Sequence, residues 1–167
     1  MRFHTVKSKL DNMTKQYWLM KSEPSAYAID DLLRDQVTHW DGVRNYQARN
    51  FMRDTMRVGD GVLFYHSVTH PVGIAGEATV VKTGYPDHTA YDPNDIHYDP
   101  KSREDRPTWF MVNVQFVRKC KKIIALSALK EIPSLEGMML LKRGSRLSVQ
   151  PVMKEEWDII MRLPEWK

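Results

Sequence analysis

The sequence predicts an α+β domain in which short strands form a small mixed barrel and a few helices lie at its periphery. Strand signals dominate the middle of the chain, and helical patterns are few and short. Strands and helices do not alternate as they do in a doubly wound nucleotide-binding sheet. At 167 residues the chain fits one domain, which is large enough to fold without disulfides or a metal ion.

Four segments carry strand patterns. Residues 17–20 and 62–65 are short apolar runs typical of buried strands, and 72–83 is rich in Val and Thr but interrupted by Gly. In 108–118 every second residue is apolar on one face, formed by Phe110, Val112, Val114 and Phe116. Trp109 falls on the other face, so it is either a wall of a cleft or a cover for one end of a barrel.

Helical spacing of apolar residues predicts helices at about 28–35, 45–56, 126–131 and 154–162. Pro151 and Pro164 bracket the last of these. Residues 85–107 contain four prolines and several Asp and Tyr residues, which indicates a long loop. Loops of that length inside a compact domain are usually functional or mobile.

The run WDGVRNYQARNFM at 40–52 is the most informative motif of the chain. Asp41-Gly42 indicates a turn, and Asn45 can cap the helix that follows. A Trp held on rigid backbone before such a turn can form a stacking wall for a flat ligand. The alternative is that Trp40 is an ordinary core residue and Asn45 only a cap.

The net charge of +4 is unevenly distributed. Residues 87–105 carry a local charge of −4, whereas 118–149 carry +6. The basic segment predicts either contacts with the phosphates of a polyanion or a solvated face with no partner. The candidate phosphate contacts are Arg118, Lys119, Lys121, Lys122 and Arg143.

Several classes of protein find little support. The single Cys120 excludes an internal disulfide and any Cys-rich zinc site, which favours a reducing compartment. His66 and His70 are four residues apart, but strand residues precede them and Pro71 follows, so no metal site is expected. Ser22 lacks the glycine-flanked turn of a hydrolase nucleophile. No Gly-rich phosphate loop is present, so we expect no cofactor.

The sequence also predicts where the protein works. No apolar stretch approaches the roughly 20 residues that span a bilayer, so no membrane association is expected. Residues 1–16 are predicted to be a flexible polar tail before a domain at 17–167. We expect an intracellular protein, cytoplasmic in a bacterium or nuclear in a eukaryote, with a monomer favoured.

Six motifs in order resemble the EVE domain family: KSEP at 21–24, WDGVRNYQARNFM at 40–52, VGD at 58–60, LFYHS at 63–67, YPD at 85–87 and RLSVQPV at 146–152. The resemblance covers about 17–160. It implies a PUA-like fold, a mixed and strongly bent β-barrel with helices against its sides, related to YTH, ASCH and PUA domains. Several relatives in that superfamily bind nucleic acids, and some accept a modified base in an aromatic pocket.

The comparison with YTH domains adds particular residues. Lys21-Ser22 matches a Lys-Ser pair at the start of the YTH domain, and Trp40 falls where that family places a Trp of its methyl-base cage. The second cage Trp falls near Val114, so Trp109 or Tyr85 is the candidate for a substitute wall. EVE proteins commonly carry a Ser helix cap where this chain has Ala28.

These observations predict a non-enzymatic domain that binds nucleic acid, DNA or RNA, and holds a modified base in a pocket. Trp40 would stack on the base, with Asn45, Ser22 and Ser67 bonding its edge and with the entrance lined by His66, Arg146 and Ser148. One alternative is a small-molecule or nucleotide-processing enzyme that uses Ser22, His66 and Asp41 or Glu23. Another is a protein-interaction module that uses 85–107.

Overall fold

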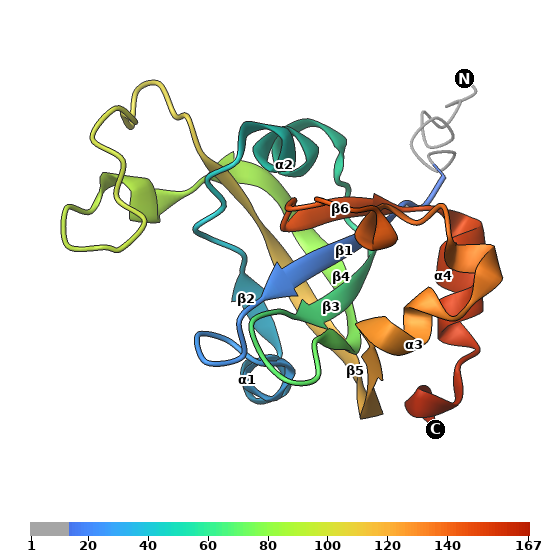
Figure 1. Cartoon of the computed structure of the whole chain (residues 1–167). Coiled ribbons are helices and arrows are strands. Elements are labelled where there is room, and N and C mark those ends of the chain that lie inside the picture. Colours follow the sequence, from blue (N-terminus) through green and yellow to red (C-terminus); the bar gives the residue numbers. More distant parts are fainter. Residues whose placement is uncertain (1–13) are drawn as a thin grey trace, which may run out of the picture.

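The computed structural model describes residues 14–167 (Figure 1). The predicted tail, residues 1–16, therefore lies outside the described residues except for its last three. Of these, Gln16 is held to the domain: its N–H donates to an Asp60 carboxylate oxygen at 3.1 Å, and its carbonyl accepts from the Gly61 N–H at 3.0 Å. Gln16 therefore contacts the domain next to its predicted boundary at residue 17.

The core of the fold is one six-stranded sheet with the order β2-β5-β4-β3-β1-β6. The strands β1 and β3 are parallel, and the other neighbours are antiparallel. Bulges along β4 and β5 bend this long pair strongly (Figure 1), and the sheet remains open between β2 and β6. The predicted α+β, PUA-like architecture is confirmed. The strands are β1 (Tyr17–Ser22), β2 (Val37–His39), β3 (Gly61–His66), β4 (Gly73–Pro86), β5 (Phe110–Ala125) and β6 (Val149–Val152).

All four predicted helices are present, at their expected places. The second one changes from α-helix to a π-helical turn, η1, after its fifth residue. No helix among residues 14–167 is long and apolar enough to cross a bilayer. The helices are α1 (Ile29–Asp35), α2 (Tyr46–Asn50), η1 (Phe51–Thr55), α3 (Leu126–Lys130) and α4 (Lys154–Met161), with 3-10 turns η2 (His88–Tyr91), η3 (Pro133–Leu135), η4 (Met139–Leu141) and η5 (Pro164–Trp166).

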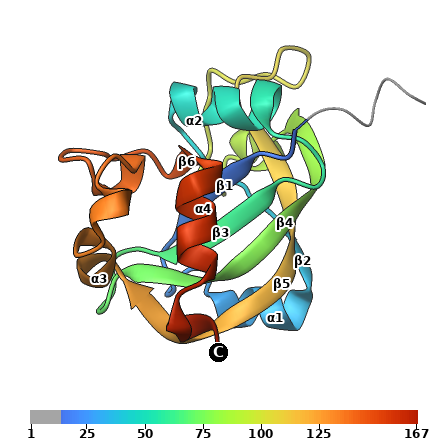
Figure 2. The same ribbon diagram turned by 90° about the vertical axis from the view of Figure 1, so that its right-hand side faces the viewer.

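Helices cover both faces of the sheet, so the sheet lies between two apolar clusters. Along β1, Trp18 and Met20 belong to the cluster on the α1 and α2 side. Leu19 points the other way and packs in the cluster of α3 and α4, which contains Trp157. Figure 2 shows α4 lying across β1 and β3. Because both faces are buried, β1 and β3 read as continuous apolar runs, as predicted.

The alternation predicted in 108–118 is only partly correct. Val112 and Val114 are fully buried as expected, but Met111 and Trp109 on the opposite face are buried too. The pairing of β5 with β4 shifts register at several bulges, and a bulge redirects the side chains of a strand. The two-residue alternation in the sequence therefore does not separate the buried from the exposed residues of this strand.

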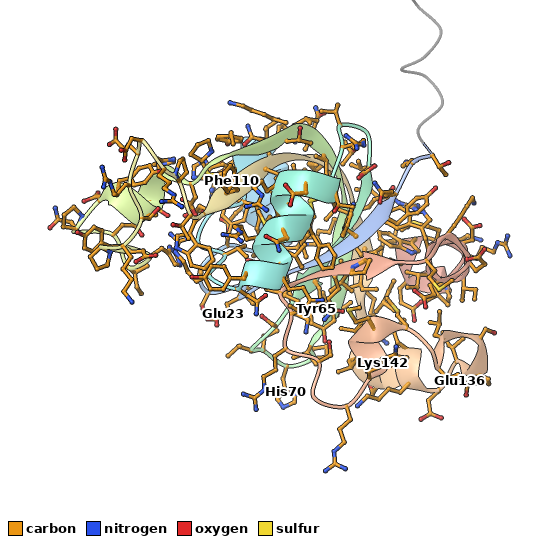
Figure 3. The ribbon with its side chains drawn as sticks, turned by 90° about the horizontal axis from the view of Figure 1, so that it is seen from above. Glu23, Tyr65, His70, Phe110, Glu136 and Lys142 are labelled. Carbon is orange, nitrogen blue, oxygen red and sulfur yellow. The ribbon has the colours of Figure 1, made fainter. Side chains whose placement is uncertain are left out.

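The segment between β4 and β5 projects beyond Phe110 at one end of the sheet, opposite α4 (Figure 3). Its turns are closed by side chains: the carboxylates of Asp92, Asp95 and Asp99 each accept the backbone N–H of the residue two positions later. Such Asx turns fix the chain without regular secondary structure. The acidic residues that give this segment its negative charge thus have a structural role.

Candidate functional site

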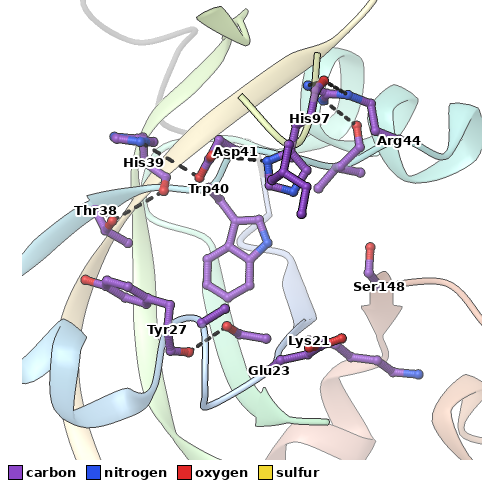
Figure 4. A pocket seen from close by; sticks show the side chains of 15 residues that line it. Lys21, Glu23, Tyr27, Thr38, His39, Trp40, Asp41, Arg44, His97 and Ser148 are labelled. Atoms are coloured by element: carbon purple, nitrogen blue, oxygen red, sulfur yellow. Dashed lines mark hydrogen bonds and ion pairs between the residues drawn. The ribbon is translucent and has the colours of Figure 1, made fainter. Parts of the chain in front are cut away.

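A pocket of about 770 Å³ opens at the end of the sheet where β1 and β2 finish (Figure 4). Its lining comes from four parts of the chain: 21–27, 38–44, 96–97 and Ser148 just before β6. Pockets that hold small ligands commonly have volumes of about 300–1,000 Å³. The space is therefore large enough for a nucleobase with its sugar.

Trp40 forms a wall of this pocket and also belongs to the core. Its indole projects toward the middle of the pocket in Figure 4, and its other side meets Phe64 edge-on, with ring centroids 5.4 Å apart. The backbone N–H of Trp40 donates to the Val112 carbonyl at 2.7 Å, and the residue is 8% exposed. Trp40 is thus a core residue that also lines the pocket, and its role as a stacking wall for a ligand stays a prediction.

The backbone after Trp40 shapes the rim, but residues 41–45 are irregular and no turn is assigned where the sequence predicted one at Asp41-Gly42. Gly42 has a φ of +77°, which favours glycine. A Cβ at this position would lie 2.6 Å from the His97 ring. A glycine here therefore lets the His97 ring lie against the backbone that follows Trp40.

Arg44 ties the rim to the β4–β5 segment, a role that sequence reasoning missed. Its guanidinium donates to the Asp87 carboxylate at 2.9 Å and to the His97 carbonyl at 2.7 Å. The Asp87 carboxylate is fully buried and also accepts from the Gly42 N–H at 2.8 Å and from the Thr89 hydroxyl at 2.6 Å. Burial raises the pKa of Asp87, but the hydrogen bonds from Thr89, Arg44 and Gly42 outweigh it and lower the pKa below its ordinary value.

Two of the predicted hydroxyls do line the pocket. The Ser22 hydroxyl donates to the Tyr27 carbonyl at 2.6 Å, and the Ser148 carbonyl accepts the Lys21 N–H at 2.8 Å. Lys21 also lines the pocket, and burial lowers the pKa of its ammonium group. The pocket thus has hydroxyl and ammonium groups close to an aromatic wall.

The aromatic residue that joins Trp40 in the lining is Tyr27, not Trp109 or Tyr85. Trp109 stacks on Tyr46 with centroids 5.0 Å apart, and its indole N–H donates to Asp99 at 2.6 Å. The Tyr85 hydroxyl bonds the side chain of Asn113. Neither supplies the substitute wall that was expected, because each packs at the base of the β4–β5 segment.

Four other predicted site residues also lie outside the lining. The Asn45 side chain accepts the Ala48 N–H at 3.0 Å, so it caps α2. His66 is buried, and its Nε2 accepts the Ile29 N–H at 3.1 Å at the start of α1. The Ser67 N–H donates to the Ser22 carbonyl at 2.9 Å. Arg146 is exposed in the irregular segment before β6 and is not part of the lining.

Two residues of the basic segment are already paired with acidic side chains. Arg118 is paired with Glu77 at 2.8 Å, and its guanidinium lies 4.3 Å from the Trp166 ring centroid. Lys119 is paired with Asp30 at 2.6 Å. The remaining candidate phosphate contacts are exposed but do not line the pocket; they are Lys121, Lys122 and Arg143.

The residues of the enzyme alternative do not form a nucleophile and base. Ser22 and His66 are neighbours in the β1–β3 register. However, the Ser22 hydroxyl is bonded to Tyr27, and the His66 Nε2 accepts a backbone N–H. A nucleophile and its base would need a hydrogen bond to each other. Within residues 14–167 no three His, Cys, Asp or Glu side chains are grouped so as to hold a metal ion.

Comparison with known proteins agrees with this architecture. Residues 16–163 match the model of the EVE domain. Thymocyte nuclear protein 1 of Homo sapiens is 46% identical over 179 residues, which cover 96% of this chain and 78% of that protein.

Two solved structures have the same fold. A protein from Leishmania major is 46% identical, with a TM-score of 0.85 over 89% of this chain and 94% of its own. Human THYN1, solved in complex with DNA that contains 5-methylcytosine, is 45% identical, with a TM-score of 0.82 over 88% of this chain and 96% of its own.

Proposed function

The chain belongs to the EVE family, and on that basis we propose that it binds DNA carrying a modified base, which it holds in the Trp40 pocket. The observation that carries the proposal is the aromatic wall in a pocket of about 770 Å³. The complex of human THYN1 with DNA containing 5-methylcytosine supports it. For this chain 5-methylcytosine is therefore the first modified base to test.

The physical basis is stacking combined with a shaped cavity. A base in a duplex reaches a pocket only by leaving the stack, as in enzymes that flip bases. Stacking on an aromatic side chain contributes about 1–3 kcal/mol per base. A methyl group adds only about 0.8 kcal/mol through burial. Preference for the modified base must therefore come mainly from the shape of the pocket around Trp40.

The proposed role is recognition without chemistry. The hydrogen bonds of Ser22 and His66 are used within the fold, so neither group is arranged as a nucleophile or base. Where the source is a eukaryote, we place the protein in the nucleus, in line with the name of its relatives.

The test compares oligonucleotides that contain cytosine or 5-methylcytosine at one position. Wild type should prefer the methylated one. Trp40→Ala should lose about 1–3 kcal/mol of binding, but it also opens the core and costs about 3–5 kcal/mol of stability. Trp40→Phe keeps an apolar ring, so it should fold while losing part of the stacking and of the preference. Binding and melting temperature are measured on the same samples.

Trp157→Phe is the matched control, because Trp157 is a buried tryptophan in the other apolar cluster. It should bind both oligonucleotides as wild type does. The proposal fails if wild type binds both equally. It also fails if Trp40→Phe melts near wild type with an unchanged preference.

A further inference from the structure

One carboxylate at the pocket differs from the other aspartates of the domain. Among residues 14–167, Asp41 alone of the aspartates accepts no hydrogen bond from a described residue. Even exposed aspartates such as Asp54 and Asp105 are bonded by a neighbouring arginine. A partly buried carboxylate normally has donors, since desolvation without them is unfavourable.

Asp41 lies at the rim, beside the indole of Trp40. Figure 4 shows it between His39 and His97. The nearest carboxylate oxygens are 3.8 Å from the His39 Nε2 and 3.9 Å from the His97 Nδ1, too far for hydrogen bonds. Its side chain is 33% exposed, so it is partly desolvated and still reachable from the pocket. The oxygens are acceptors available to a ligand stacked on Trp40.

We propose that Asp41 is a specificity-determining residue that accepts a hydrogen bond from the exocyclic amino group of the bound base. The inference rests on the proposed function and extends it. It assigns the pocket to amino-bearing bases, with the 4-amino group of cytosine as the ligand atom, rather than to bases with a carbonyl at that position.

The chemistry of the two edges supports this assignment. Cytosine presents an N4–H donor, which Asp and Glu side chains accept, whereas thymine presents an O4 acceptor that a carboxylate repels. C5 adjoins C4 in the pyrimidine ring. A carboxylate that holds the amino group therefore also fixes the direction of a 5-methyl group, so the two features are read together.

Thymine is 5-methylcytosine with its amino group replaced by a carbonyl, so this pair tests the amino group while the methyl group is kept. Single-stranded oligonucleotides with cytosine, 5-methylcytosine or thymine at one position avoid a mismatch. Wild type should bind 5-methylcytosine about 10- to 100-fold more tightly than thymine. Asp41→Asn replaces an acceptor oxygen by a donor, so this ratio should fall to about twofold or invert.

Asp54→Asn is the control, since Asp54 lies outside the pocket lining and the variant makes the same change of side chain. It should keep the wild-type ratio. Asp41→Ser provides a second variant, and melting temperatures establish that each protein is folded. If folded Asp41 variants retain the wild-type ratio, or if wild type does not separate the two bases, the assignment to Asp41 is wrong. If wild type binds no oligonucleotide, the proposed function itself fails.

Discussion

The Trp40 pocket and the basic segment 118–149 were both predicted from sequence as binding regions, but the fold treats them differently. At the rim of the pocket, the half-buried Arg44 is paired with the fully buried Asp87. In the basic segment, Arg118 and Lys119 are paired with acids from other elements. The rest are exposed, and Figure 3 shows Lys142 at the opposite end from the β4–β5 segment.

The difference between the two regions suits them to different tasks: the pocket to recognition of a base, and the basic segment to attraction of the phosphate backbone. A pocket held by buried hydrogen bonds keeps its shape before a ligand arrives, which reduces the ordering cost of binding. Exposed lysines attract nucleic acid over a long range. This attraction is screened by salt and does not depend on the base sequence. The local charge of the sequence therefore overestimates the charge available to a ligand, because ion pairs within the fold neutralise part of it.

The largest effect should come from breaking the pocket rim at Arg44. Arg44→Ala leaves the fully buried Asp87 carboxylate without its cation. Removing one partner of a buried pair costs about 3–5 kcal/mol. We expect urea unfolding to show a loss of that size and binding of the methylated oligonucleotide to vanish.

Arg44→Lys serves as the control for charge. It keeps the cation but loses the planar fork that reaches both Asp87 and the His97 carbonyl, so its stability should be intermediate. A loss below about 1 kcal/mol in Arg44→Ala would place the pair among ordinary surface ion pairs. The contrast between the two regions would then disappear.

The parts of the fold that local pattern determines could be predicted from sequence. Continuous apolar runs located β1 and β3, and helical spacing located α1 and α4. The edge strands β2 and β6 were missed, since three or four residues carry too little periodicity. Their strand character comes from pairing with β5 and β1.

The candidate site was predictable only where a motif fixed its own backbone. Trp40 and Gly42 belong to one short run, and the resemblance placed that run in a pocket. Asp87 and Arg44 are 43 residues apart in sequence, so their pairing depends on how the β4–β5 segment folds back. Tyr27 lies only five residues after Ser22, and its carbonyl accepts the Ser22 hydroxyl, but no local signal in the sequence marks it as a pocket residue.

An effect of intermediate size on stability is expected at His66. This residue pairs with Ser22 of the pocket in the β1–β3 register and is bonded to α1, which contacts the basic segment. His66 accepts the Ile29 N–H at the start of α1, and Asp30 of that helix pairs with Lys119. Burial lowers the pKa of His66, so the unfolded chain binds the proton more readily than the folded one. The stabilisation that the neutral His66 provides is therefore complete above the pKa of histidine in the unfolded chain, about 6.5. It is lost as pH falls toward the folded value.

The measurement is urea unfolding between pH 7.5 and pH 5. Protonated His66 can no longer accept the Ile29 N–H, and losing a helix cap costs about 1 kcal/mol. His66→Gln keeps an acceptor that does not titrate, so its stability should fall less over the same range. Parallel pH profiles for the two proteins would show that this histidine does not couple pH to the start of α1.

The smallest effect is expected at Lys121, and it tests the basic segment itself. Lys121 is exposed, and no acidic partner occurs for it among the described residues, whereas Arg118 is held by Glu77 and Trp166. If the segment contacts phosphates, Lys121→Ala should weaken all oligonucleotides about equally and reduce the salt slope by about 1. Arg118→Ala should leave that slope unchanged, because this guanidinium already has its partners.

Titrations at several salt concentrations, with methylated and unmethylated strands, give both the affinity and the salt slope. A changed preference for the methylated strand in Lys121→Ala would mean that the basic segment takes part in recognition. A slope that stays the same in Lys121→Ala would instead remove this lysine from the phosphate contacts, and the pocket would bind without its help.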